Sequence, residues 1–241
     1  MAIPPTYLRP TGAGWLDTIR EELLEPRLDK VRHHSVVVDS HSGKLPREAL
    51  TRLLADVLWL LVSTPNHVAA LAARCPTYRH DLKTELLQNA YSEHNHPQAL
   101  SRAVTALGGP GERILSGPEW AWGPYWATWH VRNWQELCCL SRPFVDGVAC
   151  FNVGIEAVVP SVFHPIGDGL EKHYGLTGSA LDWFRWHGGE VEEEHGNEGL
   201  KVLAAIVDPN DEEMQSRCRY IIDRTSSFIA GPWLDAYQVA S

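Results

Sequence analysis

Residues 89–109 read NAYSEHNHPQALSRAVTALGG, and they contain the end of one helix, a break and a complete second helix. Proline disfavours helical geometry at the residue before it, so we expect the chain to break at His96-Pro97. The run Gly108-Gly109-Pro110-Gly111 then ends the second helix. The segment therefore predicts two helices, over 81–93 and 97–107, with a polar turn between them.

Apolar residues at helical spacing extend this pattern over most of the chain. The only β-branched run, residues 35–40, is short, so the sequence predicts an all-α fold. Without an internal repeat or a Gly/Ser linker, residues 1–241 should form one domain of about seven helices, with 1–12 as an extended tail. The other expected helices cover 15–30, 46–61, 118–140, 144–164, 180–207 and 211–229. We expect a bend near Pro65, after the helix over 46–61, and an interruption by Pro160 within the helix over 144–164.

Composition and charge limit the function classes. The formal charge of −9 argues against a nucleic-acid partner, because nucleic-acid affinity comes largely from Lys and Arg. No secretory signal is recognisable, and the longest apolar stretch, 57–62, is far below the roughly 20 residues that span a bilayer. The five cysteines show no CxxC spacing, which predicts reduced, mostly buried thiols. We expect a cytoplasmic protein that binds neither nucleic acid nor membrane.

Twelve histidines and ten tryptophans are unusual in this chain, and excess histidine is a reason to look for metal or acid-base chemistry. Helical metal ligands come in i, i+3 and i, i+4 pairs, which share one face. Glu85, Asn89, Glu93 and His96 form such a polar stripe. The alternative is a solvated helix face with a capping histidine.

Glu156 is the only acid in an apolar stretch between Asp146 and Asp168. A buried carboxylate without a partner costs several kcal/mol, so a cation should meet it. That cation is either a metal ion or a structural partner such as Arg142. Pro160 removes the amide that would bond the carbonyl of Glu156, so a kink is expected just beyond it.

A third candidate segment, residues 183–199, reads WFRWHGGEVEEEHGNEG. Acids packed this closely repel one another unless some face solvent or a cation. A charged surface explains most of them, but not two histidines, His187 and His195, near Trp183, Phe184 and Trp186. Three separate helices thus offer carboxylates and imidazoles, which is the ligand inventory of dimetal sites in helical bundles.

The order of these segments resembles the haem-oxygenase-like di-iron oxidase family, whose fold is shared with thiaminase II and pyrroloquinoline-quinone synthase. The resemblance covers roughly residues 40–210 and rests on KLPREALTRLLADV, NAYSEHNHPQALSRAVTALGG, an isolated helical Glu and EVEEEHGNEGLKVL. It implies a haem-oxygenase-like bundle that holds two Fe(II) ions. Carried over to this chain, the implied metal ligands are Glu93, His96, Glu156, His187, Glu192 and His195.

The last ligand set departs from the family pattern of His-x3-Asp/Glu-x2-His. His187 and His195 are eight residues apart instead of seven, which on a regular helix separates them by about 80°. One residue looped out as a π-bulge, favoured by Gly188-Gly189, would bring Glu192 and His195 beside His187. The alternative is a regular helix on which Glu190 or Glu194 is the acidic ligand.

The resemblance implies that O2 reacts with the two ferrous ions to give a peroxo intermediate, which abstracts hydrogen from a C–H bond of a small carboxylate substrate. An amino acid or a fatty-acid-like molecule would then undergo desaturation, cleavage or cyclisation in specialised biosynthesis. An external electron donor and a homodimer are compatible with this expectation. Arg142 or Arg185 would clamp the substrate carboxylate, unless these arginines only form structural ion pairs.

Three other function classes remain open from the sequence. A thiaminase-like hydrolase needs a cysteine nucleophile, for which Cys138, Cys139 and Cys150 are candidates. A cofactor-free oxidase would use the same fold without metal. A non-catalytic helical binding protein would leave Glu156 and the two histidine segments unexplained.

Overall fold

The computed structural model describes residues 8–187 and 190–239, and of residues 190–195 it describes the backbone only. Most of the described residues are helical and none of them forms a strand, which confirms the predicted all-α class. The first half of the chain contains α1 (Gly14–Ile19), η1 (Arg20–Leu24), α2 (Glu25–Arg32), α3 (Ser35–His41), α4 (Arg47–Leu61), α5 (Thr64–Arg74), α6 (His80–Glu93), α7 (His96–Ala106) and α8 (Gly111–Ser116).

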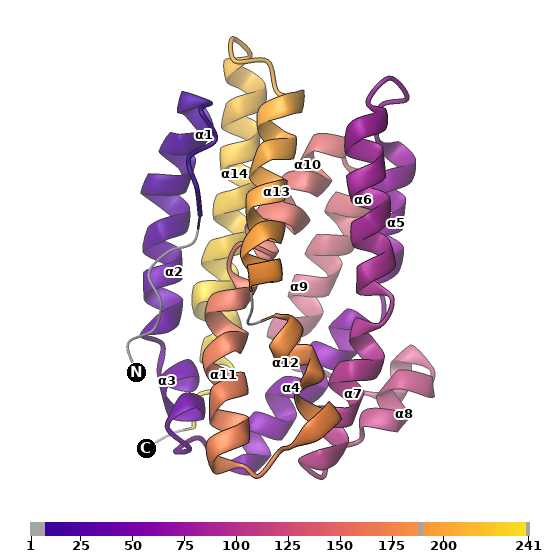
Figure 1. Cartoon of the computed structure of the whole chain (residues 1–241), viewed down its shortest axis with the longest axis vertical. Helices are drawn as coiled ribbons and strands as arrows, with labels where there is room; N and C mark the ends of the chain where they lie inside the picture. The colour runs from indigo at the N-terminus through magenta and orange to yellow at the C-terminus, as the bar shows by residue number, and fades with distance from the viewer. Residues whose placement is uncertain (1–7, 188–189, 240–241) are drawn as a thin grey trace.

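The second half contains η2 (Glu119–Ala121), α9 (Trp126–Glu136), η3 (Leu137–Ser141), α10 (Phe144–Val148), η4 (Ala149–Ile155), α11 (Val159–His173), η5 (Gly178–Leu181), α12 (Asp182–Trp186), α13 (Glu190–Ile206), α14 (Glu212–Phe228) and η6 (Ile229–Trp233). The segments η1, η3, η4 and η6 are π-helical, whereas η2 and η5 are 3₁₀ turns. Most helices run along the long axis of the molecule (Figure 1).

The helix boundaries agree with the prolines and glycines of the sequence. α6 ends at Glu93 and α7 begins at His96 with Pro97 in its first turn, as expected. The bend expected near Pro65 is a complete interruption, because α4 ends at Leu61 and α5 begins at Thr64. Residues 35–40, read as a short β-branched run, lie within helix α3, whose first turn is capped by the His34 ring accepting from the amide of Val36 at 3.3 Å.

Buried apolar side chains form one cluster that extends from Leu8 to Tyr237, so the helices share a common core. Within this cluster α14 and α13 both pack against η4, and α3 packs against α11. The tail expected over residues 1–12 is described from Leu8 onward, where Leu8 is buried and the amide of Arg9 donates to the Asn197 side chain at 2.8 Å. This part of the tail therefore packs on α13.

Two helical stretches of the described chain, Arg47–Arg74 and Phe144–His173, are long and apolar enough to cross a membrane by composition. Their most apolar windows are 61% and 94% buried inside the structure. Such burial is characteristic of core helices of a soluble protein, and in Figure 1 α10 and α11 lie among the other helices.

Candidate metal centre

Glu93 and His96 lie on either side of the break between α6 and α7, where Pro97 starts the second helix. Their side chains are buried, and the His96 Nδ1 atom donates to Glu93 Oε2 at 2.9 Å. Glu85 of the same stripe is exposed, whereas Asn89 is buried. The reading of the whole stripe as a solvated face is therefore wrong, since its C-terminal half turns into the core.

Glu156 follows directly after the π-helix η4, and its amide donates to the carbonyl of Phe151, five residues earlier, at 3.0 Å. The helix is interrupted at residues 156–158 and α11 begins at Val159, so the kink expected from Pro160 is present. The buried carboxylate of Glu156 accepts from the side-chain amides of Asn89 at 3.4 Å and Asn152 at 3.3 Å. The π-helix thus directs Glu156 toward α6.

His187 caps the C-terminus of α12, and its ring is buried. The Nδ1–H group donates to the carbonyl of Trp183 at 2.8 Å, which makes Nε2 the acceptor nitrogen of the ring. The His187 ring lies edge-on to the His96 ring with centroids 4.5 Å apart, and 4.1 Å from the Trp183 ring. A backbone carbonyl that orients an imidazole in this way is common among metal-ligating histidines.

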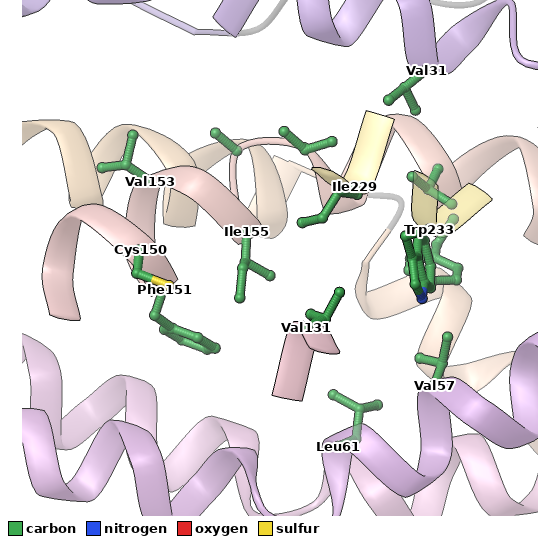
Figure 2. Packing of buried hydrophobic residues seen from close by; sticks show 14 of the residues in the cluster. Val31, Val57, Leu61, Val131, Cys150, Phe151, Val153, Ile155, Ile229 and Trp233 are labelled. Carbon is green, nitrogen blue, oxygen red and sulfur yellow. The ribbon is translucent and has the colours of Figure 1, made fainter. Parts of the chain in front are cut away.

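Glu93, Glu156 and His187 line one internal cavity of about 70 Å³. Its other walls are largely apolar, and Figure 2 shows Val57, Leu61, Val131, Ile155 and Ile229 converging on this space from four different elements. The cavity therefore presents carboxylate and imidazole groups at one side of a hydrophobic chamber.

Among residues 8–187 and 196–239, no three His, Cys, Asp or Glu side chains are arranged closely enough to hold a metal ion. Two buried oxygens, Oδ1 of Asn89 and Oδ1 of Asn152, accept no hydrogen bond within this part of the chain although both side chains lie against Glu156. Oxygens without a donor beside a buried carboxylate form an acceptor-rich environment, which favours a cation. The donor set of carboxylate and imidazole suits iron.

Glu192 and His195, with the alternatives Glu190 and Glu194, belong to the first turns of α13, and their side chains lie outside the described residues. The expected continuous helix over 180–207 is wrong, because α12 ends at Trp186 and α13 begins at Glu190. In the sequence, two residues of low helix propensity, Gly188-Gly189, follow this helix end directly. The π-bulge expected at Gly188-Gly189 lies outside the described residues.

Arg142 and Arg185 take part in ion pairs away from the cavity. Arg142 donates to Asp146 at 2.7 Å, and Arg185 donates to the carbonyl of Gly178 at 3.2 Å and lies 3.6 Å from Glu171. Neither residue lines the cavity. Their contacts agree with the structural alternative, and Arg142 pairs with Asp146 instead of Glu156.

A hydrogen-bonded network beside the cavity was missed by the sequence reasoning. Asp56 is fully buried and accepts from Trp122, from the amide of Tyr125 and from the Tyr237 hydroxyl, each at 2.8 Å. Tyr237 also contacts the hydroxyl of Thr128, a cavity residue, at 2.6 Å, and burial raises the pKa of Tyr237. The signal was available, because Asp56 is the only acid between Glu48 and Asp81, as Glu156 is the only acid between Asp146 and Asp168.

The candidate thiols for a hydrolase do not lie at this site. Cys138, Cys139 and Cys150 are buried, and none of them lines the cavity. Burial raises the pKa of both Cys139 and Cys150, which disfavours the reactive thiolate. The structure therefore offers no support for cysteine catalysis at the cavity.

The profile of a family described as iron-containing redox enzymes matches residues 52–225. No curated protein matches the chain in sequence. Among solved structures, the chain is similar to a TenA homologue from Pseudomonas syringae, with a TM-score of 0.81 at 14% identity over 98% of both chains.

Two further solved structures have the same fold. One is a domain of unknown function with a haem-oxygenase-like fold from Shewanella denitrificans, with a TM-score of 0.73 at 13% identity over 92% of this chain and 91% of that one. The other is a TenA homologue from P. horikoshii, with a TM-score of 0.71 at 16% identity over 92% and 98%. The fold of the chain is thus haem-oxygenase-like.

Proposed function

The chain belongs to the family of iron-containing redox enzymes, and from this premise we propose that it is a non-haem di-iron oxidase or oxygenase acting on a small carboxylate substrate. The observation that carries the proposal is that Glu93, Glu156 and His187 line one buried apolar cavity, with His96 in contact with both Glu93 and His187. Buried acids and imidazoles around an apolar chamber suit a metal site better than a structural core.

In this proposal the metal ligands are Glu93, His96, Glu156 and His187, completed from α13 by Glu192 and His195. When bound, the iron would supply O2 activation. The remaining chemistry belongs to the chain: hydrogen bonds from His187 to Trp183 and from His96 to Glu93 fix the imidazole orientations. The apolar cavity walls exclude water and position the C–H bond of the substrate for desaturation, cleavage or cyclisation.

A cytoplasmic location and an external electron donor form part of the same proposal. The five cysteines are free thiols, and a reducing compartment keeps them so. An oxidase that leaves its iron oxidised after each turnover needs such a donor.

The experiment is an anaerobic titration of the metal-free protein with Fe(II). We expect two irons per chain, followed by O2 consumption on exposure to air. Glu156→Ala should reduce the stoichiometry to one iron, because it removes a carboxylate ligand from the cavity. Glu85→Ala, on the exposed half of the same polar stripe, is the matched control and should still bind two irons.

Two results would contradict the proposal. A parent protein that binds no iron at high Fe(II) concentration would refute the metal site, leaving a binding protein or a cofactor-free oxidase. An unchanged stoichiometry in Glu156→Ala would refute the assignment of that ligand.

A further inference from the structure

A surface groove of about 500 Å³ lies between α9, the end of α14 and η6. Its volume is within the range of roughly 300–1,000 Å³ that is typical of small-molecule sites. Trp134, Phe228 and Pro232 form part of its apolar lining, and Thr225 and Ser227 contribute hydroxyl groups. Of the proposed metal ligands whose side chains are described, Glu93, His96, Glu156 and His187, none lines this groove.

Aromatic rings form one wall of the groove. The rings of His130 and Phe228 lie 4.4 Å apart, and Trp126 stacks on Phe228 at an interplanar angle of 7°. Trp126 is 69% exposed, so a large apolar surface borders the groove in the free chain. Exposed aromatic surface of this kind is characteristic of ligand-binding sites.

The groove also contains a cation. Arg224 lies over the Tyr220 ring, 5.5 Å from its centroid, and forms no ion pair within the described part of the chain. Two other arginines of α14 are paired, Arg217 with Asp146 at 2.6 Å and Arg219 with Glu22 at 2.8 Å. Arg224 is thus available to an anion from outside, although the chain as a whole carries a charge of −9.

The groove and the internal cavity share a wall. Val131 and Ile229 line both spaces, so these two residues lie between the groove and the chamber of Glu93, Glu156 and His187. Figure 2 shows Val131 and Ile229 as neighbours beside Ile155. A passage between the two spaces would therefore run past these two side chains.

We propose that this groove binds the head group of an elongated amphipathic carboxylate, whose apolar chain passes between Val131 and Ile229 into the cavity. The direction follows from charge. In the metal-free chain the cavity contains the carboxylates of Glu93 and Glu156, and no lysine or arginine is among its described lining residues, so a third carboxylate there would be repelled and desolvated. At Arg224 the head group stays hydrated and meets a guanidinium, while each methylene buried in the cavity strengthens binding about fourfold.

Only the reaction at the inner end of the substrate's apolar chain rests on the proposed function. Binding of the substrate in the groove does not depend on iron. It assigns Arg224 the role of binding the substrate carboxylate, and it assigns Val131 and Ile229 the role of selecting chain width.

Calorimetry on the metal-free protein tests the head group, with octanoate and 1-octanol as matched probes. We expect octanoate to bind more tightly than 1-octanol. Arg224→Met should weaken octanoate about tenfold or more and leave 1-octanol unchanged, because only the charged hydrogen bond is lost. Arg219→Met, which removes a paired arginine of the same helix, should change neither affinity.

A chain-length series tests the passage into the cavity. Affinity in the parent should rise about fourfold for each methylene from hexanoate to decanoate. Val131→Trp should abolish this increase while it retains the charge effect of Arg224.

Equal octanoate binding by the parent and Arg224→Met would overturn the head-group site, and an undiminished length dependence in Val131→Trp would overturn the passage. Because no iron is present, either failure is separate from a failure of the Fe(II) titration.

Discussion

The buried carboxylates of this bundle fall into two groups according to their partners. Asp146 accepts from Arg142 and Arg217, and Asp56 lies 3.0 Å from Arg52, so both are paired with guanidinium groups. Glu93 instead contacts an imidazole, and Glu156 contacts two asparagine amides. Glu93 and Glu156 also line the cavity, whereas Asp56 and Asp146 do not, so the second group has the position of a ligand site.

His67, on α5, makes the stability of the chain depend on pH. Burial in the core, with a smaller contribution from Arg132, lowers the pKa of His67 to about 4. The unfolded chain titrates near 6.5, so between pH 6.5 and 4 it binds the proton that the folded chain rejects. Stability should therefore fall as the pH is lowered through this window, by about 2 kcal/mol between pH 7 and pH 5 for this residue.

Urea unfolding at pH 7 and pH 5 measures this effect. His67→Gln should lose about 2 kcal/mol less than the parent on acidification, whereas His80→Gln removes an exposed imidazole and should behave like the parent. Identical losses in His67→Gln and the parent would show that His67 does not supply the pH dependence.

At the scale of helices, close crossings hold the π-helix η4 in position. Gly199 of α13 faces η4, and a Cβ atom at this glycine would lie 2.3 Å from the carbonyl oxygen of Asn152. The same asparagine donates to Glu156, so the crossing supports the candidate site as well as the fold.

Gly199→Ala should therefore destabilise the chain by about 2 kcal/mol, since a methyl group cannot fit without moving the backbone. Thermal unfolding should show a fall in Tm of about 4–8 °C. Gly14→Ala is the control, because a Cβ atom at Gly14 meets nothing within 4 Å. A Tm of Gly199→Ala within a degree of the control would contradict the close packing of α13 on η4.

Helix boundaries were predictable wherever a proline or glycine set them. Pro97 and Pro160 predicted the interruptions beside His96 and Glu156, and the structure has both. The π-helical segments were not predictable, because one i→i+5 turn alters the apolar periodicity over too few residues to be recognised. Residues 35–41 were ambiguous for a related reason: Val36, Val37 and Val38 favour strands, and tertiary packing decides for helix.

At the scale of the whole molecule, one sequence does not show which site residues that are far apart along the chain contact each other. The lone acid Glu156 was recognisable, yet its contact with Asn89 joins two helices 67 residues apart. The sequence suggested Arg142 as a carboxylate partner and gave no reason to single out Arg224. Only the fold shows that Arg142 lies on Asp146 while Arg224 lies in a groove.

All five cysteines are buried, and burial raises the pKa of Cys218 to about 12. Ellman's reagent should therefore modify none of them within minutes in the native chain and all five in denaturant, with or without prior reduction. Rapid labelling of the native chain would contradict the described core, and fewer than five thiols in denaturant without reductant would indicate a disulfide.

The π-helix η4 has a consequence for comparing this chain with its relatives. Its wider turn accommodates an additional residue, so alignment with a relative whose helix is α-helical throughout requires a one-residue gap within Ala149–Ile155. A gap placed on the wrong side of Glu156 would pair this acid with a residue about 100° away around the helix. At 14% identity, structural superposition and not residue matching has to identify the counterpart of Glu156 in each homologue.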